Sequence, residues 1–217
     1  MISLKKTFFL MIYVLSIFAL ILLVWLEHIK IVELAEGIFE HPLNNEIIHT
    51  LCTGTQKLYF VQTLCFVLFL NLLKTDYREP MLSVRYKQNL FFSVITKGII
   101  IGFVYSTYVF LVYIIITFSS GNNIVFDFYA EYIKLFLFCL YCYFSYQIVY
   151  FSFKNFYIST ICVLLCNFLV LCFAISANYY GINSNLYSML GSISFLLPLN
   201  LITLYILYLL TRKKDNL

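Results

Sequence analysis

The chain has 217 residues, of which 63% are hydrophobic and only 11% are charged. A composition this apolar excludes a water-soluble globular domain and predicts a polytopic membrane protein. The formal net charge of +4 does not indicate nucleic-acid binding, because the basic residues cluster at the ends of apolar runs.

Six membrane-spanning helices of roughly 20 residues each, with short loops, fill this length. The first apolar run follows two lysines, as in a signal peptide, but it is too long and lacks a small-residue cleavage site, so we expect an uncleaved span. The predicted fold is therefore all-α, a single transmembrane domain over residues 1–217. The expected spans are approximately 8–28, 57–73, 98–118, 132–153, 156–177 and 187–210.

The longest strongly charged interruption is residues 74–97, between the second and third apolar runs. Its charged residues include Asp76, Arg78, Glu79, Arg85 and Lys87. These side chains cannot lie in hydrocarbon without a large cost in free energy, so the segment is expected in water or at the interface. Pro80 suits the first turn of a helix, because its missing N–H would be unpaired there anyway. We expect a short surface helix or turn at residues 80–88, leading into the third span.

The distribution of lysine and arginine predicts the orientation. In this layout, all of them fall on one side of the membrane except Lys30, Lys57 and Lys134. Because cytoplasmic loops carry the excess of basic residues, both termini and residues 74–97 are expected in the cytoplasm.

The third span carries small residues at every fourth position, namely Gly98, Gly102 and Ser106. Such spacing lets two helix backbones approach closely in a bilayer. The packing partner is either a helix of the same chain or another protomer.

The fourth span places Tyr143, Tyr146, Gln147 and Tyr150 at i, i+3, i+4 and i+7, on one helix face. A polar face cannot be turned to lipid without unmet hydrogen bonds. It therefore either packs against other helices or forms the wall of a translocation path, for which Asn167 in the fifth span is a further candidate. In the sixth span, Pro198 predicts a kink, which is either static or part of a moving element.

Motifs for cofactors are absent or weak. No phosphate-binding loop occurs, and the CxxC pair Cys139 and Cys142 lies in hydrocarbon, where thiolates are disfavoured. Acidic residues and histidines at 40–49 offer metal ligands, but loops are rich in such residues by chance. We expect no catalytic, cofactor or metal site in this chain. Ionisable groups approach the spans only near their ends, so transport would need an outside energy source.

One stretch resembles a known family. Residues 78–92 read Arg-Glu-Pro-Met-Leu-Ser-Val-Arg-Tyr-Lys-Gln-Asn-Leu-Phe-Phe. A proline, a hydrophobic pair, Arg-Tyr-Lys and then aromatics lead into the third span. This is similar to the stretch between spans two and three in permease subunits of bacterial ABC-2-type ATP-binding-cassette exporters.

The resemblance implies a coupling helix that docks into a separate ATPase subunit, which holds the ATP. The residues expected to contact that ATPase are Glu79, Pro80, Arg85, Tyr86 and Lys87. It further implies a second permease, identical or sister, in a bacterial plasma membrane. The exported substrate would be hydrophobic or amphipathic, such as a peptide toxin or antimicrobial peptide. The basic residues of this segment equally suit a role as topology determinants that face lipid phosphates.

Two other functional classes stay open. A membrane-embedded enzyme or processing factor would have only Asn167, Gln147 and tyrosines as intramembrane polar groups, which is poor catalytic chemistry. A substrate-binding subunit of an importer would bind its energising protein through small residues of the first span, where Ser16 and Ala19 give a weak match.

Overall fold

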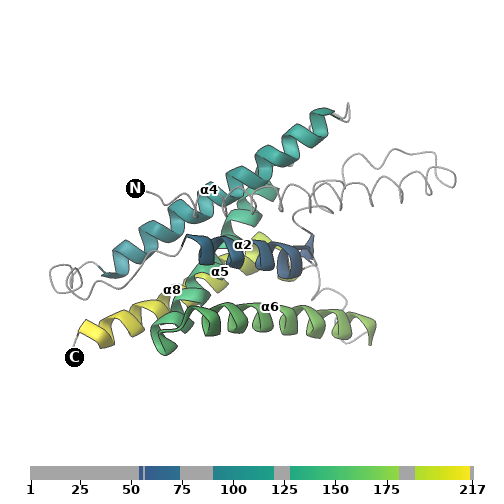
Figure 1. Cartoon of the computed structure of the whole chain (residues 1–217). Coiled ribbons are helices and arrows are strands. Elements are labelled where there is room, and N and C mark those ends of the chain that lie inside the picture. Colours follow the sequence, from purple (N-terminus) through teal and green to yellow (C-terminus); the bar gives the residue numbers. More distant parts are fainter. Residues whose placement is uncertain (1–53, 56, 74–89, 120–127, 181–188, 216–217) are drawn as a thin grey trace.

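The computed structural model describes residues 54–55, 57–73, 90–119, 128–180 and 189–215, and this part of the chain is helical without any strand. Four helices are long and apolar enough, by length and composition, to cross a membrane. The prediction of an all-α protein with membrane-spanning helices is confirmed to this extent. The elements are η2 (Lys57–Gln62), α2 (Thr63–Leu72), α4 (Leu90–Ser119), α5 (Phe128–Phe153), α6 (Phe156–Tyr179) and α8 (Ile193–Asp215), as Figure 1 shows.

The first predicted span and the predicted surface helix at residues 80–88 lie outside the described residues. Six spans and cytoplasmic termini therefore stay predictions.

Two helices begin earlier than expected. Helix α4 begins at Leu90, well before the predicted start of the third span at residue 98, and its apolar stretch is Phe91–Ile115. Lys97, which was assigned to the charged segment, is a half-buried residue inside α4. A single lysine does not end an apolar helix, because its stem lies along apolar neighbours while the ammonium reaches polar surroundings. Helix α5 begins at Phe128 and so includes Glu131, which was expected in a loop.

Helix α8 begins later than the predicted span, which starts at residue 187. A turn at Gly191 and Ser192 precedes it, and the Ser192 hydroxyl donates to the carbonyl oxygen of Met189 at 2.6 Å. A Cβ added at Gly191 would lie 2.6 Å from Oγ1 of Thr55, so this turn packs closely against residue 55.

The described apolar part of the second predicted span is short. Its apolar helical stretch, Leu58–Asn71, reaches roughly 20 Å at about 1.5 Å per residue. The hydrocarbon core of a bilayer is about 30 Å thick. The first part of this stretch is the π-helix η2, a rare conformation that occurs often at functional sites.

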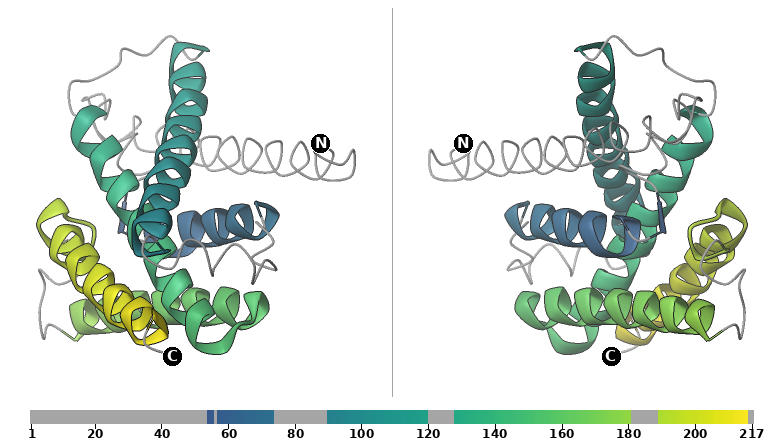
Figure 2. Two further views of the ribbon diagram at one scale, coloured as in Figure 1. Left: turned by 90° about the vertical axis from the view of Figure 1, so that its left-hand side faces the viewer. Right: turned by 90° about the vertical axis from the view of Figure 1, so that its right-hand side faces the viewer.

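Helix α5 is the centre of the molecule. It contacts α8, α4, α6 and α2, and half of its apolar stretch is buried, compared with 28% for α6 and 22% for α8. Helices α4 and α6 lie on opposite sides, with α2 between them (Figures 1 and 2). Helices α5 and α8 lie side by side and run in the same direction (Figure 2).

The small residues of α4 pack within the chain. A Cβ added at Gly98 would lie 2.6 Å from Cδ1 of Tyr143 on α5, and one added at Gly102 would lie 3.5 Å from Leu140. Ser106, the third residue of the predicted stripe, is fully buried. The face that these residues form is therefore covered by α5 of the same chain.

A two-residue turn joins α5 to α6, at the place where the sequence predicts one. Lys154 has a φ of 53°, in the left-handed region. The Asn155 side chain caps α6, because its Oδ1 accepts from the N–H groups of Tyr157 at 2.9 Å and Ile158 at 3.4 Å. The turn thus reverses the chain without leaving these two N–H groups unpaired.

Candidate functional site

The residues expected to contact an ATPase, Glu79, Pro80, Arg85, Tyr86 and Lys87, lie outside the described residues. Their proposed role stays a prediction.

The five residues suggested for a translocation path have different neighbours in the structure, and their role in such a path stays a prediction. Tyr143 is buried against Gly98 of α4, and the ring of Tyr150 stacks on Phe156 with centroids 4.5 Å apart. Gln147 is also buried, and its Oε1 has no hydrogen-bond partner. Tyr146 and Asn167, in contrast, both belong to a hydrogen-bonded layer between α2, α5 and α6, which we call the polar seam. Its members are Thr63 and Asn71 of α2, Tyr141, Cys142 and Tyr146 of α5, and Thr160 and Asn167 of α6.

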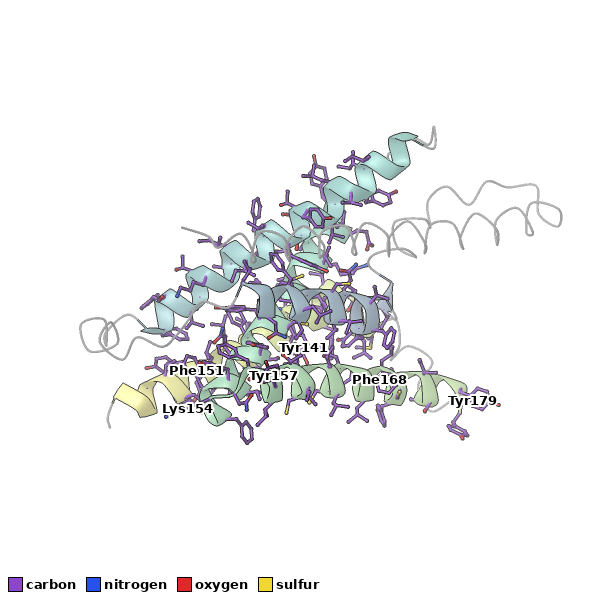
Figure 3. The ribbon with its side chains drawn as sticks, in the orientation of Figure 1. Tyr141, Phe151, Lys154, Tyr157, Phe168 and Tyr179 are labelled. Atoms are coloured by element: carbon purple, nitrogen blue, oxygen red, sulfur yellow. The ribbon has the colours of Figure 1, made fainter. Side chains whose placement is uncertain are left out.

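One end of the polar seam is centred on Asn167, whose side chain is inaccessible to solvent. Its Nδ2 donates to Oγ1 of Thr63 at 3.3 Å and to Sγ of Cys142 at 3.6 Å. The Tyr141 hydroxyl, which lies between α2 and α6 in Figure 3, donates to Asn167 Oδ1 at 3.2 Å. This one amide therefore joins three helices.

The other end is centred on Asn71. Its Nδ2 donates to Oγ1 of Thr160 at 2.8 Å, and its Oδ1 accepts from the Tyr146 hydroxyl at 3.1 Å. The Thr160 hydroxyl also bonds to the carbonyl oxygen of Phe156 at 2.9 Å. A second asparagine thus joins the same three helices.

The pairing shows that α2 and α6 are antiparallel. Thr63 pairs with Asn167 at one end and Asn71 pairs with Thr160 at the other. Between the two ends, Val67 of α2 and Val163 of α6 are both buried. The seam therefore has two polar ends and an apolar middle.

The polar seam is chemically neutral. Its amides, hydroxyls and thiol offer hydrogen-bond donors and acceptors, but no formal charge at neutral pH. Within the described residues, no group of three or more histidine, cysteine or acidic side chains could hold a metal ion. The arrangement is suited to holding helices, or a neutral hydrogen-bonding ligand, rather than to acid–base catalysis.

The chain matches no family model, no curated protein and no solved structure. Function is therefore inferred from the residues themselves and from the resemblance of residues 78–92.

The π-helix η2, which precedes the seam residue Thr63, is held by two more long-range hydrogen bonds. The Tyr59 hydroxyl donates to the carbonyl oxygen of Leu190 at 3.2 Å, and the Tyr105 hydroxyl of α4 donates to Gln62 Oε1 at 2.8 Å. The ring of Tyr59 also packs edge-on against Phe138 of α5, with centroids 5.1 Å apart. η2 is thus the point where the short helix meets α4, α5 and the turn before α8.

An ion pair lies near the start of α5. The ammonium of Lys134 contacts both carboxylate oxygens of Glu131, at 2.7 and 2.9 Å, and both side chains are largely buried. It joins neighbouring turns of one helix, so it neutralises a lysine that would otherwise be buried alone.

Sequence reasoning found Tyr146 and Asn167 but missed Thr63, Asn71 and Thr160. The available signal was their polarity within apolar runs, together with the spacing of Thr63 and Asn71, which brings both to one face of a helix.

Pro198 lies inside α8, as expected from the sequence. The nearby Asn200 Nδ2 donates to the carbonyl oxygen of Leu137 at 2.9 Å and so links α8 to α5.

Proposed function

We propose that this protein is the membrane-spanning permease subunit of an ATP-binding-cassette exporter, and that a separate ATPase subunit supplies its energy. The observation that carries the proposal is the resemblance of residues 78–92 to the ATPase-coupling segment of such permeases. The chain around this segment fits the role. Residues 74–89 join α2 to α4, and α4 packs through Gly98 against the central α5. An ATPase that binds this segment would therefore act on both α2 and α4.

The lack of an evident internal energy source also supports the proposal. Ion-coupled carriers use ionisable groups inside the membrane as relays. The polar seam, in contrast, is built from neutral side chains, and the ion pair of Glu131 and Lys134 lies near one end of α5. Energy would then come from outside the described helices.

In full, the proposed protein has six spans and cytoplasmic termini, and it works in a bacterial plasma membrane with a second permease, identical or sister. Its substrate is hydrophobic or amphipathic, such as a toxic or antimicrobial peptide.

The test is a pull-down of the tagged protein from detergent, followed by measurement of ATP hydrolysis. We expect a soluble ATPase to co-purify with the wild type and to be lost from the triple variant Glu79→Ala, Arg85→Ala, Lys87→Ala. The control is Arg212→Ala, which makes the same net charge change at an exposed residue of α8 and should keep the ATPase. Intact wild-type protein without any ATPase would refute the proposed function.

A further inference from the structure

Helix α2 is attached to the rest of the molecule differently from the long helices. Two groups of side-chain hydrogen bonds fix it against α6 and α5. Interhelical hydrogen bonds in membrane proteins contribute little individually to stability. The position of α2 is therefore specific, but each hydrogen bond that defines it is weak enough to be replaced by a bond to another partner.

The conformation next to the seam gives α2 a way to move. η2 ends at Gln62, directly before the seam residue Thr63. Rewinding one π-helical turn to the α-helical register shifts the helix by one residue, which rotates the following side chains by about 100°. Such a rotation would carry Thr63 and Asn71 away from Asn167 and Thr160.

We propose that the polar seam is the closed form of a passage that opens when α2 separates from α6, and that its ligand is neutral and rich in hydrogen-bonding groups. This inference rests on the proposed transport function and adds to it the location of a binding site and the class of ligand. When α2 moves, Asn71, Thr160 and Asn167 lose hydrogen bonds that they now make across the seam.

The hydrogen-bonding groups of the seam indicate which class of ligand could bind there. Leaving a buried amide or hydroxyl without a hydrogen-bond partner is unfavourable, so an occupant must replace both donors and acceptors. The backbone amides of a peptide carry both in each unit. A charged group would meet no opposite charge among the seam residues, and burying an unpaired charge is far more costly. Neutral stretches of a peptide therefore fit the open seam better than ionic ones.

The wild-type protein already has a cysteine whose reactivity can report whether the seam opens. Cys142 lies in the seam, with its Sγ 3.6 Å from Asn167 Nδ2, whereas Cys139 lies one turn earlier on α5 and is equally buried. The complex with its ATPase, in lipid nanodiscs, is treated with a small uncharged but strongly hydrophilic thiol reagent, with and without ATP. Mass spectrometry then locates the modified cysteines. The reagent is too polar to reach a thiol that is closed off from water.

We expect one nucleotide state to raise the labelling rate of Cys142 by roughly tenfold, as when an open state rises from about 1% to about 10% of molecules. Cys139 should stay unlabelled in both states. The seam is merely a structural contact between helices if Cys142 is unreactive in every state of a complex that hydrolyses ATP. Equal labelling of Cys139 and Cys142 would indicate that the helix packing around α5 loosens as a whole, and it would also overturn the proposal.

The other end of the seam is tested with Thr160→Cys, and the neighbouring Ser159→Cys is the matched control. Ser159 is fully buried but bonds to Asn155 outside the seam. Because residue 160 is half-buried in the structure, a cysteine there should become more reactive in the same state as Cys142, while that at 159 should stay unreactive. Reactivity at 142 without reactivity at 160 would contradict a passage that runs the length of the seam.

Ligand class is tested by protection of Cys142. The probe is the blocked neutral peptide acetyl-Leu-Ala-Leu-amide, and the zwitterionic tripeptide of the same sequence is the control. Slower labelling with the blocked peptide only is the expected result. Equal protection by both peptides, or by neither, would overturn the neutral ligand. The absence of any ATPase in the earlier pull-down would instead refute the proposed function itself, and this inference with it.

Discussion

At Gly98 the backbone of α4 lies so close to α5 that a methyl group does not fit. A Cβ there would come within 2.6 Å of Cδ1 and 2.8 Å of Cε1 of Tyr143, a side chain that is itself buried. At Gly102 the nearest atoms, on Leu140 and Phe136, would be 3.5 Å away, which is ordinary van der Waals contact. Two glycines one turn apart therefore differ in what they tolerate.

We predict that Gly98→Ala destabilises the protein by about 1–3 kcal/mol, the usual effect of overpacking a core. Gly102→Ala should be neutral, or up to about 1 kcal/mol stabilising, because alanine is the better helix former. Thermal unfolding of both variants in the same detergent measures the difference. The close approach of α4 and α5 would be contradicted if the two variants were equally stable.

At the scale of elements, the α5–α6 turn depends on one side chain. Asn155 pairs two N–H groups at the start of α6. Asn155→Ala should lower the free energy of unfolding by about 1 kcal/mol. Asn155→Asp should retain most of that stability, since its carboxylate accepts the same bonds and favours the positive helix end. Chemical unfolding of the three proteins tests this, and an alanine variant as stable as the wild type would contradict the capping role.

The four long helices could be predicted from the sequence because each is a long apolar run, which is a local property. The start of α4 could not, because one lysine at position 97 resembles the end of a charged loop although the helix continues through it. The polar seam was predicted in part. Asn167 is visible as a polar residue in an apolar run, but its partner Thr63 lies 104 residues away. No periodicity within either helix indicates which of them meet.

The same reasoning explains why the tyrosines on one face of α5 have different partners. Because α5 is surrounded by other helices, neighbouring positions on one face meet different partners. Tyr143 packs against α4, whereas Tyr146 bonds to Asn71 of α2. Polarity alone indicated burial, and the tertiary contacts decided what each residue touches.

For the whole molecule, the two ends of α6 indicate which residues are expected on opposite sides of the membrane. Lys154 and Tyr179 lie at opposite ends of this helix in Figure 3. If the basic residues face the cytoplasm, a cysteine replacing Lys154 lies inside and one replacing the exposed Tyr180 lies outside.

We predict that an impermeant thiol reagent labels Tyr180→Cys in intact cells, and that it labels Lys154→Cys only after the membrane is opened. Wild-type protein gives the background from the native cysteines. The reverse pattern would contradict the predicted orientation, and labelling of both from one side would show that α6 does not cross the membrane.

The central position of α5 also has a consequence for biosynthesis. Helices α2 and α4 leave the ribosome before α5 and α6, but the surfaces that they bury belong largely to these later helices. Until α5 and α6 are made, the Gly98 surface and the amide of Asn71 lack the partners that they have among the described helices. Early membrane insertion is therefore the stage at which this chain is most open to wrong helix pairing and to quality-control proteases. That stage ends only when both α5 and α6 have been made, because Gly98 packs against α5 and Asn71 bonds to residues of α5 and α6.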